Sequence, residues 1–111
     1  MVEKKHIVTA FDEDLTTLND IMARMGALAE TQLFASTEAL IARNPSDLDD
    51  IIKRDKELDD LEALLNEKVI EIIALRAPRA EDLRRVIVAL KVASTLERIG
   101  DLAKNIAKRN N

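Results

Sequence analysis

Apolar residues recur along this chain with the period of an α-helix. Between residues 5 and 43 they fall three or four positions apart without an intervening proline, which predicts one long amphipathic helix. Its apolar side is formed by Phe11, Leu15, Leu18, Met22, Met25, Ala29, Gln32, Ser36 and Ala39. Asn44 and Pro45 end the pattern, and Ser46 followed by Asp49 is an N-cap signal for a second helix.

Two further helices are expected after this break. The second spans about 47–76, and its apolar residues recur every seven positions. They are Ile51, Leu58, Leu65 and Ile72. Pro78 separates this helix from a third over about 79–109, with acidic residues in the first turn and basic residues in the last. The apolar positions of the third helix are Leu83, Ile87, Leu90, Ala93, Leu96 and Ile106.

Connections of a few residues make neighbouring long helices antiparallel. The predicted fold is therefore an all-α, antiparallel up-down-up three-helix bundle, with residues 1–111 as a single domain. A chain of 111 residues holds one hydrophobic core and is too short for a two-domain enzyme. The sequence contains no cysteine and no apolar run that approaches the roughly 18 residues of a membrane-spanning helix. We therefore expect a soluble, cytoplasmic protein.

Charge and residue types exclude several classes of function. Without cysteine and with His6 as the single histidine, thiolate and histidine-rich metal sites are excluded, and His6 is expected to be solvated. Residues 78–111 carry eight basic and four acidic side chains, whereas residues 46–77 carry five and ten. These opposite charges cancel across packed helices, so we do not expect nucleic-acid binding. No nucleophile–base pair or glycine-rich phosphate loop points to an enzyme.

Four acidic residues of the second and third helices are predicted to converge. In a helical hairpin that turns at Pro78, Asp55 lies level with Asp101, and Asp59 lies level with Glu97. Like charges on a partly dry face need a cation or become protonated, and hard cations accept ligand sets made only of oxygen. Gly100, between the two acids of the third helix, indicates the close approach of a neighbour or ligand.

Several interpretations of these acids stay open. In one, basic side chains neutralise them in interhelical ion pairs, and the protein is a helical scaffold or adaptor. The basic candidates are Lys53, Arg54, Lys56, Arg98 and Lys104. In another, a metal ion binds the four carboxylates. A small carboxylate-bridged metal oxidase is the least favoured, because such sites also use Glu-x-x-His pairs, which this sequence lacks.

Over nearly its whole length the chain resembles the PhoU family of phosphate-signalling regulators, whose fold is a three-helix bundle repeated twice. The motifs that carry the resemblance are Phe11-Asp-Glu-Asp-Leu15, Met25-Gly-Ala-Leu-Ala-Glu-Thr-Gln-Leu33, Asp55-Lys-Glu-Leu-Asp59, Leu75-Arg-Ala-Pro-Arg-Ala-Glu-Asp-Leu-Arg84 and, most specific, Leu96-Glu-Arg-Ile-Gly-Asp101. The chain has one repeat, so it is either a fragment of a longer protein or a one-repeat member. Either case leaves a helix face uncovered, and we predict a homodimer that imitates the two-repeat architecture.

The resemblance also implies a site. The family's metal-binding signature is a pair of (E/D)xxxD motifs on adjacent helices, which falls here on Asp55/Asp59 and Glu97/Asp101. Glu62 is a further candidate ligand, and Glu30 and Gln32 are weaker candidates at similar height on the first helix. The implied cofactor is a hard divalent or trivalent metal ion, with Fe, Mn, Mg, Ca and Zn as the candidates.

The function that the resemblance implies is non-enzymatic. It is negative regulation of phosphate uptake and of phosphate-starvation signalling through protein contacts. The implied partners are the ATP-binding subunit of a phosphate ABC transporter and a sensor histidine kinase, and these partners would provide the only link to the membrane.

Overall fold

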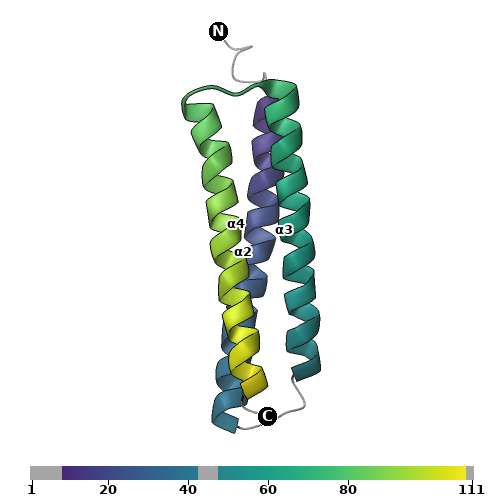
Figure 1. Cartoon of the computed structure of the whole chain (residues 1–111), viewed down its shortest axis with the longest axis vertical. Helices are drawn as coiled ribbons and strands as arrows, with labels where there is room; N and C mark the ends of the chain where they lie inside the picture. The colour runs from purple at the N-terminus through teal and green to yellow at the C-terminus, as the bar shows by residue number, and fades with distance from the viewer. Residues whose placement is uncertain (1–8, 43–47, 110–111) are drawn as a thin grey trace, which may run out of the picture.

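The computed structural model of the chain describes residues 9–42 and 48–109, so His6 and the predicted cap at Ser46 lie outside the described part. It confirms the three-helix bundle. The helices are α2 (Ala10–Ala42), α3 (Leu48–Arg76) and α4 (Glu81–Arg109), and each contacts both others. α3 runs antiparallel to α2 and α4 along a molecule about 60 Å long (Figure 1). None of the described helices is both long enough and apolar enough to cross a membrane.

Local hydrogen bonds set the start of α2. The Thr9 hydroxyl accepts a hydrogen bond from the backbone N–H of Asp12 at 3.0 Å, and the Asp12 carboxylate accepts one from the backbone N–H of Thr9 at 3.4 Å. This reciprocal pair is a capping box, which satisfies backbone donors that the first turn leaves free. The described helix therefore begins at Ala10, and the predicted start near residue 5 lies outside the described residues.

Two alanines in the left-handed backbone region shape the connection between α3 and α4. Ala77 has a φ of 45° and donates its backbone N–H to the Ile73 carbonyl at 3.2 Å, which ends α3. Ala80 has a φ of 50° and directly precedes Glu81, the first residue of α4. The third helix therefore starts two positions after the predicted residue 79.

The core contains most of the residues that the sequence pattern assigns to the first two helices, and Phe11, Leu15 and Met22 pack against it partly buried. Leu18 and Met25 of α2 are buried, and the seven-residue seam of α3 is buried completely. This seam consists of Ile51, Leu58, Leu65 and Ile72, each with no exposed surface. Burial of aliphatic side chains on this scale is the main stabilising contribution in a bundle of this kind.

The predicted core face of the third helix is wrong in part. Leu83, Ile87 and Ile106 remain 37%, 36% and 40% exposed, and Leu90 and Leu96 are only half-buried. The buried residues of α4 are Val86, Ala89, Ala93, Gly100, Ala103 and Ala107. Small side chains let α4 approach the other two helices closely, and the larger aliphatic side chains then lie along the edges of the contact.

A partly buried ion-pair cluster joins α2 to the end of α3. The Asp14 carboxylate accepts a hydrogen bond from Arg76 Nε at 2.9 Å and pairs with Lys68 Nζ at 3.1 Å. The Arg76 hydrogen bond is the largest influence that holds the pKa of Asp14 below its usual value, although burial opposes it. Asp14 is only 7% exposed, so its charge depends on these two partners.

Candidate functional site

The five acidic side chains between α3 and α4 form the strongest candidate site, here called the acidic cluster. Its members are Asp55, Asp59, Glu62, Glu97 and Asp101. Helix geometry places Asp59 and Glu97 at the same height, and Asp59 is one of the groups that raise the pKa of Glu97.

Glu97 shows the electrostatic state of the cluster. Burial raises its pKa from 4.5 to about 7, and the hydrogen bond with Asp59 and the negative charges of Glu62, Asp59 and Asp101 act in the same direction. Each of these influences disfavours the ionised form of Glu97. Near neutral pH, the negative charge of the acids around Glu97 is therefore larger than the positive charge of the basic side chains near them.

Asp55 has a different environment at the other end of the acidic cluster. It is 5% exposed, and Lys104 Nζ donates a hydrogen bond to its Oδ2 atom at 2.9 Å. The same ammonium group lies 3.4 Å from Asp101 Oδ1, so Lys104 bridges an acid of α3 and an acid of α4. The hydrogen bond to Asp55 is the main reason that the pKa of Lys104 is raised. The Oδ1 atom of Asp55 is buried and has no hydrogen-bond partner among the described residues.

Gly100 lies where α4 passes closest to these acids. A Cβ atom at this position would overlap the side chain of Leu58, which is fully buried, and would lie 3.8 Å from Asp55 Oδ1. The close approach predicted at Gly100 is therefore present, and the neighbour is Leu58. Any larger residue at position 100 would push Leu58 and α4 apart.

The acidic cluster has ligand atoms of the right type for a hard cation, but the side chains are not arranged as a metal site. Within residues 9–42 and 48–109, no three acidic or histidine side chains are placed so that they could hold one ion. Asp59 is one of the acids that raise the pKa of Glu97, whereas Asp55 and Asp101 share Lys104. The binding of a metal by all of these acids would require these side chains to rearrange, and Lys104 to move away.

The weaker candidates on α2 do not join the acidic cluster. Gln32 is fully buried, and its Nε2 atom donates to the Ile51 carbonyl at 2.8 Å. Its Oε1 atom accepts a hydrogen bond from Arg54 Nε at 2.9 Å, so both of its polar atoms serve to hold α2 against α3. Glu30 is exposed and is not among the charges that act on Glu97.

The basic residues that the sequence offered as neutralising partners have separate outcomes. Among the residues that the structure describes, Lys104 is the one basic side chain that forms ion pairs with the acidic cluster. Arg54 bonds to Gln32, and Lys56 forms an exposed pair with Asp60 at 3.5 Å on its own helix. Arg98 is exposed and forms no ion pair with any residue in the part of the chain that the structure describes.

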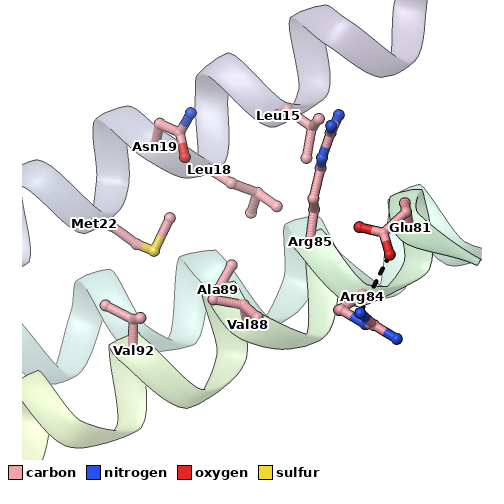
Figure 2. Close-up of a pocket in the computed structure, with 10 residues that line it drawn as sticks. All are labelled: Leu15, Leu18, Asn19, Met22, Glu81, Arg84, Arg85, Val88, Ala89 and Val92. Atoms are coloured by element: carbon pink, nitrogen blue, oxygen red, sulfur yellow. Dashed lines mark ion pairs between the residues drawn. The ribbon is translucent and has the colours of Figure 1, made fainter.

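Sequence reasoning missed a second feature, an apolar groove of about 330 Å³ between α2 and α4. Figure 2 shows Leu15 and Met22 of α2 opposite Val88 and Val92 of α4. The complete lining is Leu15, Leu18, Asn19, Met22, Glu81, Arg84, Arg85, Val88, Ala89 and Val92. The groove was missed because the pattern assigned the wrong residues of the third helix to the core.

Exposed aliphatic side chains extend this groove along both helices. Leu33 and Leu40 lie about three and five helical turns beyond Met22 and are 45% and 53% exposed. Ile106, five turns beyond Val88, is 40% exposed. We call this surface the α2–α4 face and define it by the apolar groove together with Leu33, Leu40 and Ile106. Exposed apolar side chains that recur along one side of a helix are typical of a surface that another protein covers.

Comparison with known proteins gives consistent matches. The family model described as the PhoU domain matches residues 22–109. The chain is 49% identical over 104 residues to the phosphate-specific transport system accessory protein PhoU homolog of Zymomonas mobilis, and 43% identical over 104 residues to that of Rhizobium meliloti. Each alignment covers 94% of this chain and 44% of the relative.

A more distant relative shows the same coverage. Identity to the phosphate-specific transport system accessory protein PhoU of Escherichia coli is 36% over 107 residues, which cover 94% of this chain and 43% of that protein. The chain therefore spans less than half the length of these curated relatives.

Proposed function

Because the chain belongs to the PhoU family, we propose that it is a non-enzymatic regulator that lowers phosphate uptake and phosphate-starvation signalling in the cytoplasm. The observation that carries this proposal is the family match over residues 22–109. It is supported by relatives that are named accessory proteins of the phosphate-specific transport system and that align with 94% of the chain.

The proposed mode of action is contact with other proteins. The partners that we propose are the ATP-binding subunit of a phosphate ABC transporter and a sensor histidine kinase, and the protein reaches the membrane only through them. This mode is supported by the relatives, which are named accessory proteins of the phosphate-specific transport system. No catalytic step is part of the proposal.

A reporter of the phosphate-starvation response tests this function. The chain, and two copies joined in tandem, would be expressed in Escherichia coli cells that lack their own PhoU protein. We expect the reporter signal in phosphate-rich medium to fall relative to an empty vector, and Val88→Asp in the α2–α4 face to weaken this effect. An unchanged signal with both versions, at normal protein levels, contradicts the proposal.

We also propose that a second copy of the chain covers the α2–α4 face. The chain aligns with 44% of its relatives' length, and a second bundle could bury the exposed apolar side chains of the α2–α4 face. Light scattering over a concentration series should give the mass of a dimer. Val88→Asp should shift the mass to that of a monomer, whereas Ile70→Asp, at a 69% exposed site on α3, should leave the dimer intact. A monomeric mass for the unaltered protein contradicts this proposal.

The acidic cluster is proposed to bind a hard cation, with Asp55, Asp59, Glu97 and Asp101 as ligands and Glu62 as a further ligand. Its surplus of negative charge around Glu97 supports the proposal. A bound ion would supply positive charge that links α3 to α4. Mass spectrometry of metal content after incubation with Fe, Mn, Mg, Ca and Zn should show retention by the unaltered protein and loss in Glu97→Gln/Asp101→Asn. Equal, negligible retention in both contradicts it.

A helical adaptor whose acids are only ion-paired is the second candidate function. The Lys104–Asp55 bond at 2.9 Å favours it, because a basic side chain already neutralises the most buried acid. The metal measurement distinguishes the two candidates.

A further inference from the structure

Lys104 supplies the only positive charge that contacts the acidic cluster within residues 9–42 and 48–109. Its ammonium group reaches an acid on each helix, Asp55 at 2.9 Å and Asp101 at 3.4 Å. Two carboxylates of adjacent helices share this ammonium group. It therefore lies in the position that a metal ion bound by the same carboxylates would take. The arrangement therefore raises the question of which cation the acids hold.

We propose that Lys104 is the resident cation of the acidic cluster and competes directly with metal ions for Asp55 and Asp101. The inference rests on the proposed metal-binding function and adds a side chain of the protein itself as a competitor of the metal ion. A metal ion binds these acids only when the ammonium group leaves them. Lys104 thereby lowers the affinity of the cluster for metal and keeps α3 and α4 linked when no metal is bound.

The burial of the two partners supports this exchange. The Asp55 side chain is 7% exposed, so its carboxylate is held inside the contact between α3 and α4. The Lys104 side chain is 21% exposed and has a flexible four-carbon stem, so its charged end can move into water. The exchange thus moves lysine while the carboxylate stays in place.

The unpaired oxygen of Asp55 provides independent support. Oδ1 is buried without a hydrogen-bond partner in the described part of the chain, although Oδ2 is bonded to Lys104. A buried carboxylate oxygen without a hydrogen-bond donor is energetically unfavourable. The ammonium group of Lys104 bonds to the other oxygen of Asp55 and pairs with Asp101, so it does not satisfy this oxygen. A cation with more coordination positions could satisfy both oxygens, which is why metal can replace lysine here at all.

Removal of the Lys104 charge tests the competition. Lys104→Met keeps most of the aliphatic stem, and Lys108→Met removes an exposed charge one turn further along α4 as the matched control. Binding of Mn²⁺ would be measured at low ionic strength from the electron paramagnetic resonance signal of the free ion. We expect Lys104→Met to bind Mn²⁺ about 10-fold more tightly than the unaltered protein, and Lys108→Met to change affinity by less than about twofold.

A second measurement uses the unaltered protein and does not depend on a variant that folds. An amine-reactive reagent followed by mass spectrometry reports the accessibility of each lysine. The addition of Mn²⁺ should increase the labelling rate of Lys104, because its ammonium group is released, and leave that of Lys108 unchanged.

The outcomes separate this inference from the metal-binding proposal. Mn²⁺ binding of equal strength in the unaltered protein and Lys104→Met, with constant labelling of Lys104, overturns the competition and leaves metal binding standing. A gain in Lys108→Met as large as in Lys104→Met overturns it as well, because the effect would then be general charge repulsion. Absence of Mn²⁺ binding by all three proteins overturns both proposals.

Discussion

Gly100 offers a sharp test of how α3 and α4 pack. The chain has two glycines, both within helices, and their surroundings are opposite. A Cβ atom at Gly26 would meet no heavy atom within 4 Å, whereas a Cβ atom at Gly100 would overlap Leu58. The same substitution, glycine to alanine, should therefore have opposite effects on the free energy of unfolding at the two sites.

The expected magnitudes follow from two contributions. Alanine stabilises a helix interior by about 1 kcal/mol relative to glycine, and this gain applies at both positions. At Gly100 the new methyl group must displace Leu58, which has no exposed surface into which it could move. Overpacking of this kind costs about 1–3 kcal/mol. Gly26→Ala should thus stabilise the protein by about 1 kcal/mol, and Gly100→Ala should destabilise it by about 1 kcal/mol.

Urea denaturation followed by circular dichroism at fixed protein concentration measures both values. A Leu58→Ala background provides the control for the cause. There the methyl group at position 100 meets no obstacle, so Gly100→Ala should become stabilising relative to Leu58→Ala alone. If Gly100→Ala stabilises the unaltered background as much as Gly26→Ala does, the close contact between Gly100 and Leu58 is refuted.

Three further predictions concern charge and backbone. Asp14→Asn should lower the free energy of unfolding by about 2 kcal/mol at pH 7, because Arg76 loses its carboxylate partner. Since the pKa of Asp14 is lowered from 3.8, this difference in the free energy of unfolding should persist above about pH 4 and shrink as the pH falls further. Urea titrations at several pH values measure this difference. A difference that stays constant with pH would contradict the prediction. Glu97 has its pKa raised from 4.5 to about 7, so its ionisation costs stability as the pH rises through this range. With a chelator present, Glu97→Gln should be more stable than the unaltered protein by about 1 kcal/mol near pH 8 and no more stable near pH 4, and equal stability at both pH values would exclude the buried, acid-crowded environment of Glu97. Ala77→Gly should leave the free energy of unfolding unchanged or raise it by up to about 1 kcal/mol in thermal melts, because glycine tolerates the positive φ. The exposed helical control Ala63→Gly should lower it by about 1 kcal/mol. Equal losses at both sites would argue against the left-handed backbone at Ala77.

The sequence was sufficient to predict the helices and most of the core. Proline breaks and seven-residue spacing determine the number of helices and the buried seam of α3, because a long helix must bury its apolar side. The same spacing rule favoured large aliphatic residues of α4 as core, and the structure instead buries Ala89, Ala103 and Ala107 beside the predicted Ala93. Periodicity identifies an apolar side, but it does not reveal that a narrow contact between three helices selects the small residues on that side.

The candidate site was predictable in its position and not in its bonding. Equal distance from the turn at Pro78 predicts that Asp59 and Glu97 lie level with each other, because helical rise is constant, and Asp59 is one of the groups that raise the pKa of Glu97. The same rule paired Asp55 with Asp101. It did not predict that the long side chain of Lys104 extends along α4 and places its ammonium group in contact with both acids. The reach and direction of flexible side chains depend on tertiary packing, which spacing along a helix does not specify.

Direct binding to the proposed transporter partner tests the central claim of this account. The ATP-binding subunit of the high-affinity phosphate transporter from the organism that encodes this chain would be titrated onto the immobilised protein in biolayer interferometry. The ATP-binding subunit of a sugar transporter serves as the control. A regulator of phosphate uptake should bind the phosphate transporter subunit saturably and should not bind the control subunit. Absence of binding, or equal binding to both subunits, would contradict the claim.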